Sequence, residues 1–124
     1  MKTSYFAAAK KLPETVAISR GVPRGWKGRW YTDLAPSWEL VKVKDEMEYT
    51  RRYKEEVLGK LDPATVYQEL GENTVLLCWE KPGEFCHRRL VAEWLQKNLH
   101  IEVSEYAPEP KEKTKKPETQ VSIF

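Results

Sequence analysis

The chain has 124 residues, of which 21 are basic and 19 are acidic, so its formal net charge is +2 at neutral pH. This length allows one domain with its own core, and the near-neutral charge excludes a polycation that binds nucleic acid through charge alone. No apolar run reaches the roughly 18–20 residues of a membrane span, and the N-terminus has no apolar segment typical of a secretory signal. Two cysteines do not make a disulfide scaffold, so we expect a cytoplasmic protein without a membrane partner.

Strand-forming and helix-forming segments alternate over residues 1–106. Apolar, β-prone or alternating runs predict strands at residues 3–6, 15–19, 74–79 and 101–106. Helical character is predicted over residues 36–61, 62–70 and 85–99, with a single helical turn at 7–11 and irregular chain over 20–38. Asp62 and Pro63 form a helix start, and Gly71 ends that helix. The alternation predicts a small three-layer, Rossmann-like α/β domain with a mostly parallel sheet of about four strands.

The composition changes after the last predicted strand. Residues 107–119 contain three prolines, seven charged side chains and no aromatic or β-branched apolar residue. Such a segment cannot bury enough surface to compensate the entropy lost on ordering. We therefore expect an α/β domain over residues 1–106, a disordered linker over 107–119 and a short linear motif over 120–124.

The chemistry-bearing residues gather around the end of the third predicted strand. In open α/β sheets, ligands bind outside the carboxyl ends of the strands, and a following helix offers unpaired N–H groups there. Glu80 at the strand end is a candidate general base, and Cys86 and His87 at the helix start are candidates for a thiolate and an acid–base group. Arg88 is a candidate clamp for a phosphate or carboxylate.

Each of these residues also has a purely structural interpretation. Cys78 is expected in the core, because it lies in an apolar strand. Cys86 fits a packed helix face as well as a reactive role, Glu80 could cap the helix or pair with Arg88, and His87 could lie on the helix surface. The two cysteines, Glu80 and His87 could together bind a metal, but their spacing matches no established zinc pattern, so no metal ligands are assigned and the cofactor is unknown.

The same residues carry a family resemblance. Cys78-x-Glu80 and Cys86-His87-Arg88, followed by an apolar helix, resemble the bacterial and phage family known as domain of unknown function 488. Weaker similarities occur in residues 3–6, 18–23 and 34–38, so the resemblance covers about residues 1–106. It implies a compact α/β domain in which these residues lie near one cleft, and it implies no particular reaction.

A basic and aromatic loop follows the second predicted strand. Its members are Arg20, Arg24, Trp26, Lys27, Arg29, Trp30 and Tyr31. Such residues grip a phosphate backbone and stack a base, and we expect Arg20, Arg24 and Trp26 to contact a nucleotide or a DNA end in the cleft. The alternative is a solvated loop whose tryptophans pin it to the body.

Residues 120–124 form a candidate partner-binding motif. Gln120-Val121-Ser122-Ile123-Phe124 resembles the pentapeptide Gln-Leu-Ser/Asp-Leu-Phe that binds the bacterial DNA sliding clamp. Ile123 and Phe124 would fill an apolar pocket of that partner, while Gln120 would form hydrogen bonds at its edge. Alternatives are that the segment folds back onto the body or has another partner.

Three classes of function follow from these observations. The first is a DNA-associated domain that holds a phosphate-bearing ligand in its cleft and is tethered to the sliding clamp; whether it is an enzyme stays open. The second is a non-catalytic clamp-binding protein, such as a phage protein, that blocks or diverts the host clamp. The third is a metal- or thiol-dependent domain that uses Cys78 and Cys86. A thiol phosphatase does not fit, because Arg88 follows Cys86 by only two residues.

Overall fold

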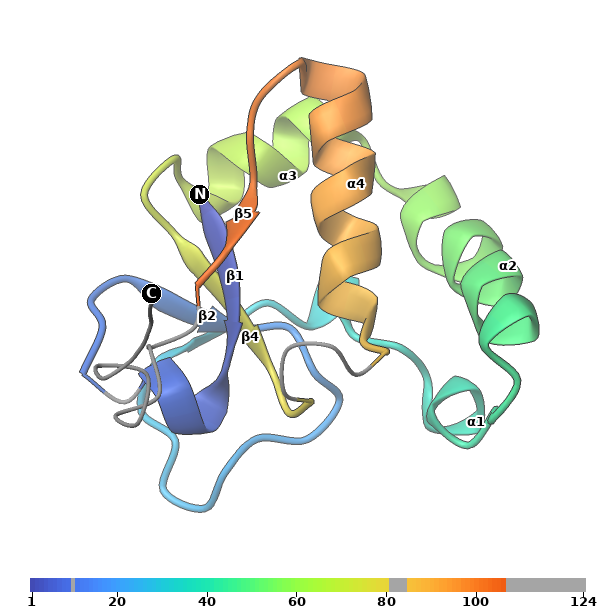
Figure 1. Cartoon of the computed structure of the whole chain (residues 1–124), viewed down its shortest axis with the longest axis horizontal. Coiled ribbons are helices and arrows are strands. Elements are labelled where there is room, and N and C mark those ends of the chain that lie inside the picture. The colour runs from blue at the N-terminus through green and yellow to red at the C-terminus, as the bar shows by residue number, and fades with distance from the viewer. Residues whose placement is uncertain (10, 81–84, 107–124) are drawn as a thin grey trace, which may run out of the picture.

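The computed structural model describes residues 1–9, 11–80 and 85–106, and it shows one sheet with helices packed against it (Figure 1). The strands are β1 (Lys2–Tyr5), β2 (Thr15–Ala17), β3 (Arg29–Trp30), β4 (Val75–Cys78) and β5 (Ser104–Glu105). Their order is β3-β2-β4-β1-β5, and the pairings between neighbours are parallel. The expected α/β domain with a mostly parallel sheet is therefore confirmed, with five strands in place of about four. The extra strand, β3, lies in the segment that we expected to be irregular.

The helices follow the capping signals of the sequence. They are α1 (Trp38–Val41), α2 (Glu46–Glu56), α3 (Pro63–Leu70) and α4 (His87–Leu99), with 3-10 turns η1 (Phe6–Ala9), η2 (Thr32–Leu34) and η3 (Leu58–Lys60). The side chain of Asp62 accepts a hydrogen bond from the Thr65 amide, and Gly71 ends α3 with a φ of 100°, as predicted. The segment expected to be helical over 36–61 is divided, because Ser37 and Asp45 each cap a separate helix.

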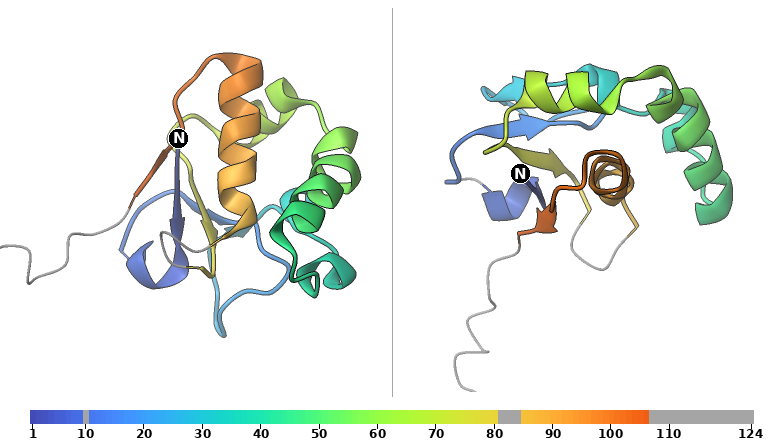
Figure 2. Two further views of the ribbon diagram at one scale, coloured as in Figure 1. Left: turned by 45° about the vertical axis from the view of Figure 1, so that its right-hand side comes forward. Right: turned by 90° about the horizontal axis from the view of Figure 1, so that it is seen from above.

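The two faces of the sheet are covered differently (Figure 2). Val16, Ile18 and Leu76 belong to the larger core, which also contains the buried apolar residues of α2, α3 and α4. Alternate strand residues, among them Ala17 and Leu77, belong to a smaller cluster closed by η1 and the loop around Trp26. The second face thus has a short turn and a loop over it in place of a full helical layer.

The connections leave β2 and β4 in opposite directions. From β2 the chain continues to β3, which forms one edge of the sheet. From β4 it passes through α4 to β5, which forms the opposite edge beyond β1. Neighbouring strands whose connections diverge leave a crevice at their carboxyl ends, and ligands bind at such points in open α/β sheets. The topology therefore places the candidate site above β2 and β4.

The remaining sequence predictions concern the lengths of β4 and β5, the C-terminal segments and a membrane span. The last two strands are shorter than predicted, since β4 ends at Cys78 and β5 spans only Ser104–Glu105. The predicted linker, 107–119, and the predicted clamp motif, 120–124, lie outside the described residues. Within the described ranges, the helices are too short or too polar to cross a membrane.

Candidate functional site

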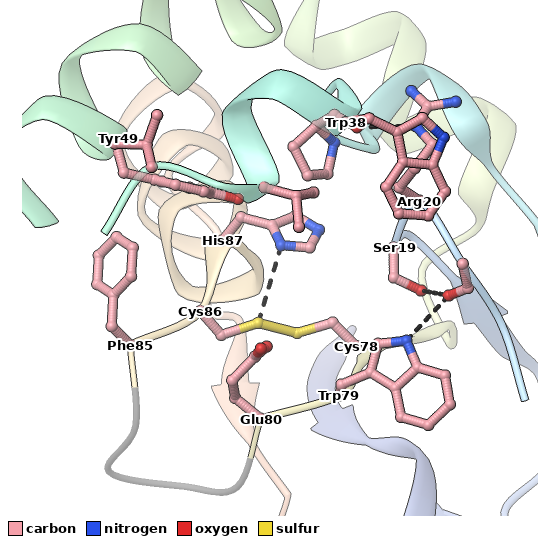
Figure 3. Close-up of a pocket in the computed structure, with 14 residues that line it drawn as sticks. Ser19, Arg20, Trp38, Tyr49, Cys78, Trp79, Glu80, Phe85, Cys86 and His87 are labelled. Atoms are coloured by element: carbon pink, nitrogen blue, oxygen red, sulfur yellow. Dashed lines mark hydrogen bonds between the residues drawn. A yellow bond between two sulfur atoms is a disulfide. The ribbon is translucent and has the colours of Figure 1, made fainter. Parts of the chain in front are cut away.

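A pocket of about 430 Å³ lies at the crevice between β2 and β4 (Figure 3). Three segments converge there: residues 78–80 at the end of β4, residues 85–87 at the start of α4, and residues 19–21 after β2, which are distant from both in the sequence. Side chains from α1 and α2 complete the wall. The structure thus brings the three predicted catalytic residues, Glu80, Cys86 and His87, to one pocket.

The two cysteines meet on the floor of this pocket. Cys78 ends β4 and Cys86 precedes α4, and the structure joins their sulfur atoms in a disulfide. Both residues are buried, with 1% and 5% of their surface exposed. Cys78 is buried, as its apolar strand predicts, but its sulfur faces Cys86 and the pocket, which the local sequence pattern did not indicate.

His87 is held in one tautomer by the backbone. Its Nε2 lies 2.7 Å from the carbonyl oxygen of Ile18. A carbonyl oxygen only accepts hydrogen bonds, so Nε2 carries the proton and Nδ1 keeps its lone pair. Nδ1 lies 3.8 Å from the sulfur of Cys86. Burial lowers the pKa of His87 to about 4. The hydrogen bond to Ile18 opposes this shift, and the positive charge of Arg88 adds to it. At neutral pH the ring is therefore an uncharged acceptor that faces the sulfur pair.

Arg88 lies behind the pocket and is bound by protein groups. It is 1% exposed, and its Nε and Nη2 donate to the carboxylate of Glu105 at 3.1 and 2.8 Å. Its Nη1 donates to the sulfur of Cys78 at 3.0 Å and to the carbonyl oxygen of Glu80 at 2.7 Å. A phosphate would have to displace Glu105 to reach this guanidinium. In this arrangement Arg88 organises the pocket floor, and Glu105 is a site residue that sequence reasoning missed.

One carboxyl group and one hydroxyl group point into the pocket. Glu80 is exposed at the rim, and Tyr49 reaches in from α2 (Figure 3). Burial, with a smaller contribution from the charge of Glu80, raises the pKa of Tyr49 well above its usual value of 10.0. Tyr49 therefore remains a hydrogen-bond donor, while Glu80 offers acceptor oxygens on the other side.

Two tryptophans that sequence reasoning left without a role form part of the pocket wall. Trp38 and Trp79 are 61% and 51% exposed although both are large and apolar. The indole nitrogen of Trp79 donates to the carbonyl oxygen of Gly21 at 3.0 Å, which fixes the ring beside the loop after β2. The sequence could have identified both residues by their positions, because Trp38 begins a helix and Trp79 directly follows a buried strand.

The basic loop contributes one of its predicted contacts to this pocket. Arg20 lines the pocket, and its Nε and Nη2 donate to the carbonyl oxygens of Pro36 and Ala35 at 2.8 and 3.3 Å. Arg24 is exposed and does not line it. Trp26 packs against Phe6 on the other face of the sheet, with ring centroids 5.3 Å apart, as the alternative interpretation of this loop expected.

A comparison with protein families identifies one to which the chain is similar. A family model described as the active DUF488-N3 subclade, DUF488-N3a, matches residues 8–99. This range is well over half of the chain and includes both halves of the Cys78-x-Glu80 and Cys86-His87-Arg88 pattern. No curated protein matches the chain, and no solved structure does.

Proposed function

The chain belongs to the DUF488 family, and we propose that it is a DNA-associated domain that holds a nucleotide, or the terminal nucleotide of a DNA strand, in the pocket between β2 and β4. We further propose that residues 120–124 tether this domain to the bacterial sliding clamp. The observation that carries the first part is the polar and aromatic pocket at the point where the strand connections diverge.

The lining of the pocket suits a planar, negatively charged ligand. A volume of about 430 Å³ falls within the range of roughly 300–1,000 Å³ found for small-molecule sites. The exposed rings of Trp38 and Trp79 offer aromatic surface, and stacking on such a ring is worth about 1–3 kcal/mol per base. Arg20 at the rim supplies a positive charge for a phosphate.

The pocket also holds groups that could act on a bound nucleotide. Neutral His87 presents Nδ1 as a proton acceptor, Glu80 presents a carboxylate, and Tyr49 presents a hydroxyl donor. Acceptors and donors on opposite sides of one ligand are the ingredients of acid–base chemistry. Which reaction these groups could catalyse depends on which of the candidate ligands binds.

Nucleotide binding is tested by calorimetric titration of the full chain with nucleoside mono- and triphosphates and with short single-stranded DNA bearing a terminal phosphate. We expect one class of these ligands to bind, and Trp38→Ala to weaken binding about tenfold, which corresponds to the loss of one stacking contact. Met47→Ala is the matched control, because Met47 is also apolar and exposed but lies outside this pocket. Absence of binding by every probe, or equal binding by Trp38→Ala, contradicts the proposal.

The clamp tether is tested separately. The sequence Gln120-Val121-Ser122-Ile123-Phe124 supports it through its apolar pair and its glutamine, and a linker of this length would span roughly 20 Å as a random coil. Calorimetry should show micromolar binding of the full chain to a bacterial sliding clamp, and loss of that binding in the Gln120→Ala/Phe124→Ala double variant. Clamp binding by a chain that binds no nucleotide would favour the alternative of a non-catalytic clamp-binding protein.

A further inference from the structure

We infer that Cys78, Cys86 and His87, once the disulfide is reduced, bind a zinc ion on the floor of the pocket. Cys78 Sγ, Cys86 Sγ and one ring nitrogen of His87 lie within 4.8 Å of one another, and all three residues are buried. Two thiolates and one imidazole are ligands that Zn²⁺ prefers in proteins. The inference does not depend on which ligand the pocket takes. Because Nδ1 of His87 cannot bind zinc and accept a proton at the same time, its role as a proton acceptor belongs to the oxidised, metal-free form.

The distance between sulfur and nitrogen suits a shared ion. Cys86 Sγ and His87 Nδ1 lie 3.8 Å apart. With Zn–S near 2.3 Å and Zn–N near 2.0 Å, two ligands of a tetrahedral ion lie about 3.5 Å apart. His87 would therefore need only a small adjustment to share an ion with Cys86.

The backbone spacing of the cysteines points the same way. Their Cα atoms are 7.4 Å apart, beyond the roughly 4.4–6.8 Å that is usual for disulfides. An ion between the two sulfur atoms lengthens the connection between the backbones, so this spacing suits two thiolates on one metal. The fold, and not the local spacing along the sequence, creates this arrangement, which is why no zinc pattern was visible in the sequence.

The neighbouring hydrogen bonds orient the ligand atoms. His87 donates its Nε2 proton to the Ile18 carbonyl oxygen, and metal-binding histidines almost always make such a bond with the other ring nitrogen. Arg88 donates to Cys78 Sγ at 3.0 Å, which stabilises a thiolate there. Three protein ligands leave a fourth position for water or a ligand atom, as in catalytic zinc sites.

Reduction must precede metal binding. A dithiol or phosphine reductant supplies two electrons, and with two protons the disulfide becomes two cysteine thiols while the reductant is oxidised. Zn²⁺ then displaces the two thiol protons and binds both sulfurs as thiolates. The oxidised and the metal-bound forms are therefore mutually exclusive.

The first test is a Co²⁺ titration of the full chain, reduced with a phosphine and freed of metal with a chelator. We expect one Co²⁺ per chain, with thiolate-to-cobalt charge-transfer absorption and the visible bands of a tetrahedral ion, both abolished by Zn²⁺. Cys78→Ser and Cys86→Ser should each remove about half of the charge-transfer absorption, because one of two thiolates is lost, and weaken binding at least tenfold. His87→Asn should weaken binding as well but keep that absorption. His100→Asn is the matched control, because His100 is the second of the two histidines and lies exposed at the end of α4.

A second test needs no substitution. In the reduced wild-type chain, Zn²⁺ should protect both cysteines from alkylation by iodoacetamide, and a chelator should restore their reactivity. A titration without cobalt absorption, absorption that is unchanged in Cys78→Ser, or alkylation that Zn²⁺ does not slow would each overturn the inference. Those results would instead assign the pair to thiol–disulfide chemistry alone. Nucleotide binding is measured on the oxidised chain, so the two proposals fail separately.

Discussion

The guanidinium of Arg88 and the carboxylate of Glu105 form a two-point ion pair that joins the first turn of α4 to strand β5. Two nitrogens of Arg88 reach the two oxygens of Glu105 at 3.1 and 2.8 Å, and the side chains are 1% and 21% exposed. The third nitrogen reaches Cys78 and the Glu80 carbonyl oxygen on the pocket floor. The pair therefore connects an edge strand to the candidate site.

Replacing Glu105 should destabilise the protein strongly. In Glu105→Gln the buried charge of Arg88 loses its counter-ion, which typically costs about 3 kcal/mol or more of unfolding free energy. Urea denaturation at neutral pH measures this change. Glu102→Gln is the matched control, because Glu102 is exposed on the chain leading to the same strand, and it should change the unfolding free energy by less than about 0.5 kcal/mol. A similar small effect in both variants would contradict the structural role of the pair.

The elements that the sequence predicted well are those with local signals. Asp62 and Gly71 mark the two ends of α3 because the cap depends on one side chain and the positive φ on one glycine. The continuous apolar run identified β4 because a central parallel strand is buried on both faces. Two-residue β3 carries no periodic pattern and forms by pairing with β2, so nothing local could predict it.

The candidate site was predicted in part for the same reason. Glu80, Cys86 and His87 reach the pocket because they follow the end of β4, and ligands bind at the carboxyl ends of strands in open α/β sheets. The order of residues along the sequence is enough to apply this rule. Arg88 was assigned to a phosphate because its partner, Glu105, is 17 residues away in a strand beside β1. The pairing of Cys78 with Cys86 likewise depends on how α4 packs against β4 rather than on residue types.

The N-cap of α3 should contribute measurably to stability. The carboxylate of Asp62 accepts hydrogen bonds from the amide and the hydroxyl of Thr65 at 3.0 and 2.9 Å. Asp62→Ala leaves that amide without its partner and should lower the unfolding free energy by about 1 kcal/mol. Asp62→Asn should restore most of the loss, because asparagine caps as well as aspartate. Equal losses in both variants, measured by thermal unfolding, would show that the cap is not the cause.

Tyr31 should make stability depend on alkaline pH. Partial burial, and then its hydrogen bond to Glu69, raise the pKa of Tyr31 above its usual value of 10.0. Above pH 10 the unfolded chain loses this proton while the folded chain keeps it, so the contribution is fully present below pH 10 and decreases as the pH rises. In Tyr31→Phe the melting temperature should fall less steeply above that pH than in the wild type. The other tyrosines are common to both chains and cancel in the comparison; parallel pH profiles would refute the assignment.

Tyr53 should stabilise the core beside His87 through one buried hydrogen bond. Its hydroxyl donates to the carbonyl oxygen of Leu34 at 2.6 Å, and both residues are fully buried. Tyr53→Phe keeps the ring but leaves that carbonyl oxygen without this donor, which should cost about 1–2 kcal/mol of unfolding free energy. Tyr67→Phe is the comparison, because Tyr67 is only partly buried at the edge of the same core, and it should cost less than about 0.5 kcal/mol. The Tyr53 ring lies 5.4 Å from that of His87. A cost near zero would show that the hydroxyl bond to Leu34 does not stabilise this part of the core.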